Sequence, residues 1–99
     1  MVRSSDEILK ILQENCEKIK SFGVRRLGLF GSAVRGDASE ASDLDFVVEL
    51  KPKTFDAYMD LKEFLENLLG CPVDLVVADA IKPRLRVPIL DEAVYVQGL

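Results

Sequence analysis

The chain has 99 residues and a mass of 11.0 kDa, the size of one small domain with a single modest core. Hydrophobic residues make up 48% of it and charged residues 30%, which is typical of a folded globule rather than a disordered segment. The net charge of −4 argues against a general nucleic-acid binder, and the absence of histidine excludes imidazole-based triads, zinc sites and general bases.

The two cysteines, Cys16 and Cys71, are too few for a disulfide framework or an all-cysteine zinc site. We expect both to be small buried thiols. The first six residues lack the apolar core of a signal peptide, and no apolar run reaches the length of about 20 residues that spans a bilayer. These features predict a cytoplasmic protein.

The first third of the chain predicts a helix, a strand and a polar loop. Apolar residues recur every three or four positions over residues 6–21, which predicts one amphipathic helix capped by Ser4 or Ser5. Residues 26–30 are largely apolar and predict a first strand. Residues 31–42 are small and polar, so they suit a loop with at most a short helical turn.

Two further strands and a helix are predicted next. Residues 43–50 alternate with the period of two that is typical of a strand. Residues 55–69 carry apolar side chains at helical spacing and stop at Gly70, so they predict a helix. Residues 72–78 form an apolar strand that carries one charge, Asp74.

Proline interrupts the end of the chain. Pro83 and Pro88 limit residues 80–91 to short helical pieces, and residues 92–96 close the chain as a strand or an extended tail. The order of elements predicts an α/β fold, with a small sheet flanked by helices in a single domain over residues 1–99.

Two acidic residues on the second predicted strand are candidates for a metal site, although the pair alone favours a plainer interpretation. Asp43 and Asp45 are two positions apart, so their side chains share one face of the strand, with Cα atoms about 6.5 Å apart. Like charges placed there repel unless a cation lies between them, and Mg²⁺ prefers oxygen ligands. The alternative is that Asp43 caps a turn and Asp45 is a solvated edge residue.

Asp74 adds a third carboxylate. It could be a solvent-facing residue on a one-sided strand, but its same-face neighbours, Pro72 and Val76, do not resemble a solvated face. If this strand pairs beside the second one, three carboxylates converge into a site for two metal ions about 3.5–4 Å apart.

A glycine turn follows the first predicted strand. Gly31 allows backbone amides to approach an anion closely, and Ser32 adds a hydroxyl for a phosphate. Arg35 could add a bidentate phosphate contact. Taken alone, Gly31 and Ser32 are better explained as a plain tight turn; the signal is their combination with Asp43 and Asp45, ten residues further on.

Three segments together resemble the minimal nucleotidyltransferases of the DNA polymerase β superfamily. They are LFGSAVRGD at residues 29–37, SDLDFVV at 42–48 and VDLV at 73–76. Residues 86–96 are similar to the C-terminal end of that family. The resemblance covers nearly the whole chain and implies a polymerase β-like palm, with a small mixed β-sheet flanked by helices.

The resemblance implies a role for each matching residue. Gly31 and Ser32 would hold the β- and γ-phosphates of the nucleotide. Asp43 and Asp45 would bind two Mg²⁺ ions, and Asp74 would complete the metal nearer the acceptor and help to deprotonate its hydroxyl. The family commonly pairs with a HEPN-domain ribonuclease in toxin–antitoxin modules, and its antitoxin members transfer AMP from ATP to a toxin tyrosine.

We therefore expect a Mg²⁺-dependent nucleotidyltransferase that uses ATP and forms a hetero-oligomer with a HEPN toxin, with no DNA or membrane partner. One alternative is a non-catalytic antitoxin that acts by direct binding, and another is transfer to RNA or a small molecule. The basic groups at residues 25–26 and 82–86 are solvated surface or, alternatively, contacts to ATP phosphates or a partner.

Overall fold

Four strands form one mixed sheet in the computed structural model, which describes residues 5–31, 34, 44–51 and 54–99. The strands are β1 (Val24–Phe30), β2 (Leu44–Leu50), β3 (Val73–Val77) and β4 (Val94–Tyr95). Their order across the sheet is β3-β2-β1-β4. β1 is antiparallel to both of its neighbours, whereas β2 and β3 are parallel. The predicted α/β architecture with a small mixed sheet is confirmed.

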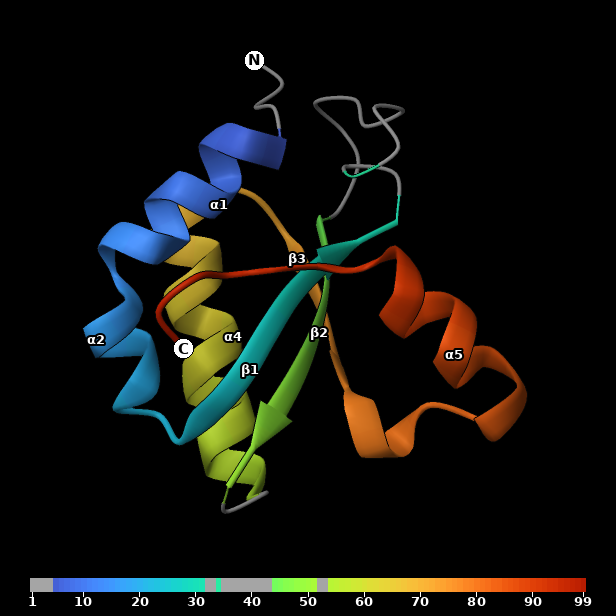
Figure 1. Ribbon diagram of the computed structural model, residues 1–99. Coiled ribbons are helices and arrows are strands. Elements are labelled where there is room, and N and C mark those ends of the chain that lie inside the picture. The colour runs from blue at the N-terminus through green and yellow to red at the C-terminus, as the bar shows by residue number, and fades with distance from the viewer. Residues whose placement is uncertain (1–4, 32–33, 35–43, 52–53) are drawn as a thin grey trace.

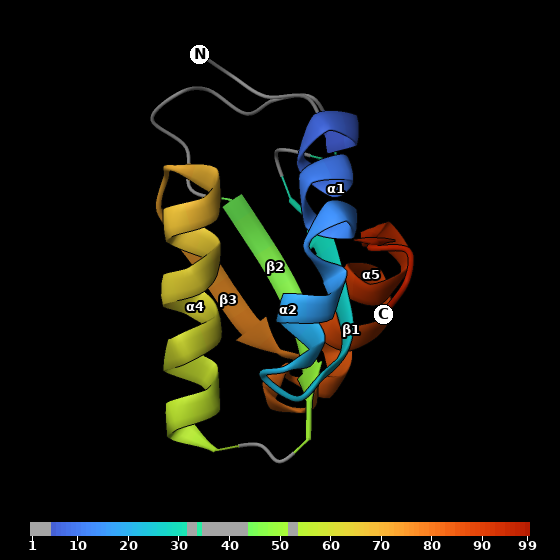
Figure 2. The same cartoon turned by 90° about the vertical axis from the view of Figure 1, so that its left-hand side faces the viewer.

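Helices cover the two faces of this sheet unequally (Figure 1). They are α1 (Ser5–Glu14), α2 (Cys16–Lys20), α4 (Phe55–Leu69) and α5 (Pro83–Glu92), and a short 3-10 turn, η1 (Ala78–Ala80), precedes α5. α1, α2 and α4 lie together on one face, and α5 lies against the other (Figure 2). Within the described part of the chain, no helix combines the length and the apolar character that a membrane crossing requires.

The main core fills the space between the sheet and α1, α2 and α4. Its fully buried side chains come from all of these helices and from the two central strands: Ile8, Leu12, Ile19, Leu27, Leu29, Phe46, Val48, Leu61 and Leu65. A second, smaller cluster lies on the other face under α5 and is centred on Val47, Ala78 and Ile81. Side chains at alternate positions of β2 therefore pack in the two clusters, because successive side chains of a strand point to opposite faces.

The single helix predicted over residues 6–21 is in fact two helices. The break falls at Asn15, whose side-chain amide donates to the Ile11 carbonyl at 2.8 Å. Asparagine interrupts helices in this way because its side chain competes for backbone hydrogen bonds. Leu12 before the break and Ile19 after it both enter the main core, so the apolar spacing continues across it.

The prediction of short helical pieces over residues 80–91 is wrong, because α5 is one helix of ten residues. Pro83 occupies its first turn, where a missing amide costs no helical hydrogen bond. Pro88 lies inside the helix, but its side chain is exposed. The backbone hydrogen bond that it removes is therefore lost on a side of the helix that water can reach.

Smaller differences concern boundaries and burial. β1 begins at Val24, two residues before the predicted strand, and the loop predicted over residues 31–42 lies mostly outside the described residues. Cys16 and Cys71 are half-buried rather than buried. The predicted end of α4 is confirmed, with Gly70 in the left-handed conformation at φ +70°.

Tyr58 joins α4 to the strand that carries Asp74, and this bond can be tested. Its hydroxyl donates to the Leu75 carbonyl at 2.6 Å in a partly buried position. Tyr58→Phe should lower the free energy of unfolding by about 1 kcal/mol, because the carbonyl loses its donor. Tyr95→Phe is the control and should change stability by less than about 0.5 kcal/mol, since the Tyr95 hydroxyl makes no hydrogen bond to the described residues. Urea denaturation measures both changes; equal losses would contradict the role given to Tyr58.

Candidate active site

The register of the sheet brings two of the predicted acids together. β2 and β3 run parallel, and Asp45 is paired with Asp74. Neighbouring strands lie about 4.8 Å apart and register partners project from the same face, so the two carboxylates are side by side. Phe46 and Leu75, the next residues along each strand, are buried in the main core. Asp45 and Asp74 therefore project from the opposite face, the one that α5 partly covers.

Asp74 is exposed, and this corrects one expectation. On β3, Val73 and Leu75 are buried, whereas Asp74 is exposed and Val76 is half-buried. The strand is therefore one-sided, and the prediction that Asp74 avoids a solvated face is wrong. Its place beside Asp45, rather than its burial, distinguishes it from an ordinary surface acid.

The glycine turn after β1 packs directly against Asp45. Gly31 has a φ of +78°, in the left-handed region that favours glycine. A Cβ built on Gly31 would overlap Oδ2 of Asp45 and would lie 3.1 Å from its Cγ and 3.2 Å from its Cβ. Any larger residue at this position would therefore displace the Asp45 carboxylate as well as strain the backbone.

Other predicted site residues, Asp43, Ser32 and Arg35, lie outside the described residues. Within the described ranges, no group of three or more acidic or cysteine side chains is close enough to hold a metal ion. What the structure does bring together is Gly31, Asp45 and Asp74.

The chemistry of this pair fits an oxygen-preferring divalent cation. Two adjacent carboxylates repel each other, and a cation between them offsets that repulsion. Carboxylate oxygens are the donors that Mg²⁺ takes in proteins, whereas softer metals prefer nitrogen or sulfur. The absence of a side chain at Gly31 is what lets the Asp45 carboxylate lie directly against the backbone of this turn.

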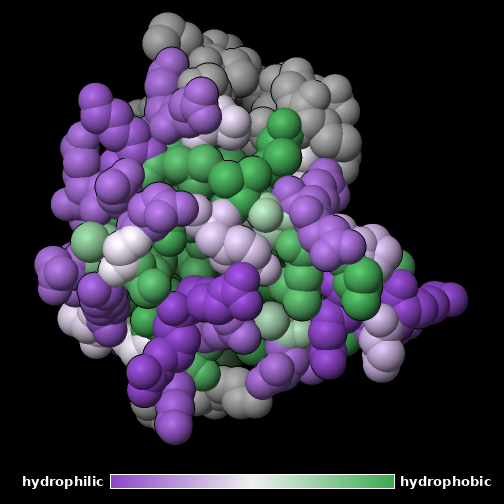
Figure 3. All heavy atoms as spheres, in the orientation of Figure 1, coloured by the Kyte–Doolittle hydropathy of each residue, from purple (hydrophilic) through white to green (hydrophobic). Residues whose placement is uncertain are grey.

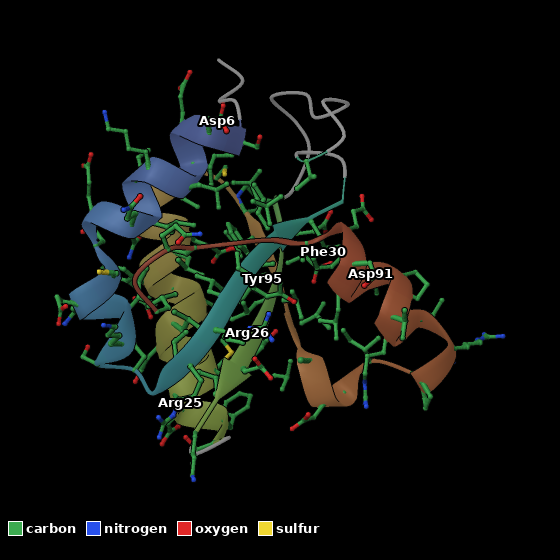
Figure 4. The ribbon with its side chains drawn as sticks, in the orientation of Figure 1. Asp6, Arg25, Arg26, Phe30, Asp91 and Tyr95 are labelled. Carbon is green, nitrogen blue, oxygen red and sulfur yellow. The ribbon has the colours of Figure 1, made fainter. Side chains whose placement is uncertain are left out.

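Phe30 is a neighbour of Asp45 that sequence patterns did not single out. It pairs with Asp45 across β1 and β2, so Phe30, Asp45 and Asp74 form a row across one end of the sheet. The ring is half-buried and packs on the second cluster, where the end of α5 approaches β1 (Figure 4). Only the pairing register reveals this row, because the pattern of a single strand does not show its neighbours.

The basic pair Arg25 and Arg26 lies at the other end of the sheet. Arg26 pairs with Glu49, four positions along β2 from Asp45, which corresponds to about 13 Å of strand. Its guanidinium is 3.4 Å from the Glu49 carboxylate and 4.1 Å from the centre of the Tyr95 ring (Figure 4). A pocket lined by both arginines opens at that end. This placement favours the surface interpretation of the pair over contact with ATP phosphates.

Known proteins match this sequence over most of its length. The nucleotidyltransferase domain family matches residues 8–96. Protein adenylyltransferase MntA of Thermococcus cleftensis is 41% identical over 93 residues, which are 92% of this chain and 94% of that protein. A candidate protein adenylyltransferase of Methanocaldococcus jannaschii is 34% identical over 100 residues, which are 96% of this chain and all of that protein.

Solved structures show the same fold. A candidate minimal nucleotidyltransferase has a TM-score of 0.73 at 40% identity and covers 87% of this chain and 93% of its own. The complex of a tri-AMPylated HEPN toxin with an MNT antitoxin from Shewanella oneidensis has a TM-score of 0.64 at 19% identity, over 92% of this chain and 73% of that one. At that identity the likeness shows the fold alone. The chain belongs to the nucleotidyltransferase domain family and is a homologue of the protein adenylyltransferases.

Proposed function

We propose that this chain transfers AMP from ATP to a tyrosine of a partner HEPN-domain toxin in a Mg²⁺-dependent reaction. The observation that carries the proposal is the pairing of Asp45 with Asp74 directly beside the Gly31 turn. The kind of reaction is supported by the T. cleftensis relative, a protein adenylyltransferase. The kind of partner is supported by the S. oneidensis complex, in which an MNT antitoxin accompanies an AMPylated HEPN toxin.

Each site residue has a proposed task. Gly31 and Ser32 hold the β- and γ-phosphates through backbone amides and a hydroxyl, and Arg35 adds a bidentate contact to a phosphate. Asp43, Asp45 and Asp74 are the ligands for two Mg²⁺ ions. When bound, such ions stabilise the charge on the transferring phosphate and activate the acceptor oxygen.

The reaction itself is an in-line substitution at the α-phosphorus. The tyrosine oxygen forms the new bond to phosphorus as the bond to the bridging oxygen breaks, and pyrophosphate leaves. Asp74 is exposed beside Asp45, so it can orient the incoming hydroxyl and assist removal of its proton. Neither a histidine base nor a covalent enzyme intermediate is required, which agrees with a chain that contains no histidine.

The openness of the row suits a side chain of a folded protein as acceptor. Asp74 is exposed and Asp45 and Phe30 are half-buried, so the acceptor does not need to enter an enclosed cavity. The net charge of −4 disfavours a polynucleotide in the same position.

Thermal unfolding tests the metal ligands. A non-hydrolysable ATP analogue with Mg²⁺ should raise the melting temperature of the wild type, because a ligand present at 100 times its Kd stabilises the folded state by about 2.7 kcal/mol. Asp45→Asn should abolish this rise. Glu49→Gln is the control: it removes a charge from the same face of β2 at its far end, and it should leave the rise intact. A rise in Asp45→Asn equal to that of the wild type would contradict the assignment.

A pair of glycine variants tests the close approach at Gly31. Gly31 and Gly70 both have a positive φ, +78° and +70°, but a Cβ on Gly70 would meet no described atom within 4 Å. Both alanine variants should lose about 1–2 kcal/mol of stability from the strained backbone. Only Gly31→Ala should also weaken ATP-analogue binding, by tenfold or more in a calorimetric titration, because its methyl group displaces Asp45. Equal weakening in Gly70→Ala would mean that the effect is general destabilisation.

Mass spectrometry tests the transfer itself. After incubation with the wild type, ATP and Mg²⁺, the HEPN-domain partner should gain the mass of one or more adenylyl groups, located on tyrosine. Asp74→Asn should slow the transfer by about 100-fold or more while retaining part of the nucleotide affinity, because its metal serves the acceptor. Label found on RNA or a small molecule, with none on the partner, would favour the alternative acceptor classes.

A further inference from the structure

α5 has two sides that differ in exposure. The half-buried side consists of Arg86, Ile89, Leu90 and, directly after the helix, Ala93. The exposed side consists of Arg84, Val87, Pro88 and Asp91. Each set follows the i, i+3, i+4, i+7 spacing of a single helix face. We call the second set the outward stripe of α5.

The inner side of α5 carries the contacts that hold the helix to the sheet. Ile89 and Leu90 pack on the second cluster, and the Arg86 guanidinium donates to the carbonyls of Asp79 and Ile81, both at 3.3 Å. No residue within α5 is fully buried, whereas α1 buries two residues and α4 buries three. A helix of ten residues is marginal by itself. Further contacts on the outward stripe would therefore stabilise α5.

The centre of the outward stripe is apolar. Val87 is 64% exposed, and Leu85, on its flank, is 46% exposed. Pro88 has no amide, so the Arg84 carbonyl lacks its usual helical donor and can accept a hydrogen bond from another molecule. In the space-filling view, apolar side chains over α5 lie among polar ones (Figure 3).

The first half of α5 presents positive charge beside this apolar centre. Lys82 and Arg84 are exposed, residues 82–88 contain no acid, and the third cation there, Arg86, is turned inward. Asp91 is the acid at the far end of the stripe, where α5 approaches Phe30 (Figure 4). A complementary surface would be an apolar groove with carboxylates near Lys82 and Arg84.

The end of α5 adjoins the candidate active site. Residues of its last turn and Phe30 pack on the same cluster, and Phe30 pairs with Asp45. An acceptor protein must approach this end of the sheet for its tyrosine to reach Asp45. A specific partner covers about 800 Å² of each protein, and this molecule exposes 5894 Å² in all. A footprint of that size around Asp45 extends onto the adjoining helix.

We propose that the outward stripe of α5 docks the acceptor protein, which receives it in an apolar groove with an acidic rim. The inference rests on the proposed function and extends it by stating how the acceptor is held. α5 then acts as a helix laid in a groove, with Val87 at the centre and Arg84 opposite a carboxylate.

The test compares Val87→Asp with Phe55→Asp. Phe55 is 75% exposed on α4, on the opposite face of the sheet, so the control places the same charge at an exposed apolar position elsewhere. Val87→Asp should raise the KM for the HEPN-domain partner, and the Kd of the complex measured by calorimetry, by tenfold or more. The kcat at saturating partner and the affinity for the ATP analogue should stay within twofold of the wild type, and Phe55→Asp should leave all four values unchanged.

A second pair of variants tests the charge. Arg84→Glu should weaken the complex and reduce its dependence on salt, whereas Lys10→Glu, at an exposed position of α1, should do neither. Thermal melts check folding, and Val87→Ser replaces Val87→Asp if the latter is unfolded. A partner Kd within twofold of the wild type in the folded Val87 variant, or equal losses in Phe55→Asp, would overturn the proposal. Failure of the proposed function would give a different result. The wild type would then bind the partner without transferring AMP, and the comparison of the Kd values would still show whether the outward stripe is the docking surface.

Discussion

The register that pairs Asp45 with Asp74 is the constraint on which the site depends. The two acids lie side by side because β2 and β3 are parallel and in one specific register. A slip of one residue would turn Asp74 toward the main core and bring Leu75 to the open face. Leu61 and Leu65 of α4, which packs against β3, are buried in the main core. Burial in the main core therefore opposes such a slip and offsets the cost of holding two like charges together.

The fold divides its two sheet faces between stability and chemistry. One face carries α1, α2, α4 and nearly all of the fully buried side chains. The other carries the row of Phe30, Asp45 and Asp74, a small apolar cluster, and α5, none of whose residues is fully buried. The main core stabilises the domain from one face of the sheet. The acids, the glycine turn and the outward stripe of α5 can therefore remain accessible to ligands on the other face.

The strands and α4 could be predicted from sequence because their signals are local: a period of two, a helical spacing and a terminal glycine. Asn15 and Pro88 misled the prediction in opposite directions. The apolar period masked the helix break at Asn15, and Pro88 is tolerated because its lost hydrogen bond is exposed to water. The exposure of Asp74 and the places of Asp74 and Phe30 beside Asp45 could not be predicted, since exposure and pairing across strands are properties of the sheet rather than of one segment.

The ribonuclease activity of the proposed HEPN-domain partner tests the central claim most directly, because it separates chemical transfer from inhibition by contact. The partner is treated with wild type plus ATP, with wild type without ATP, and with Asp43→Asn/Asp45→Asn plus ATP, all with Mg²⁺. The account predicts inhibition only in the first sample, because adenylyl transfer needs both ATP and the carboxylates. Equal inhibition in all three samples would contradict it and would identify this chain as an antitoxin that acts by binding alone.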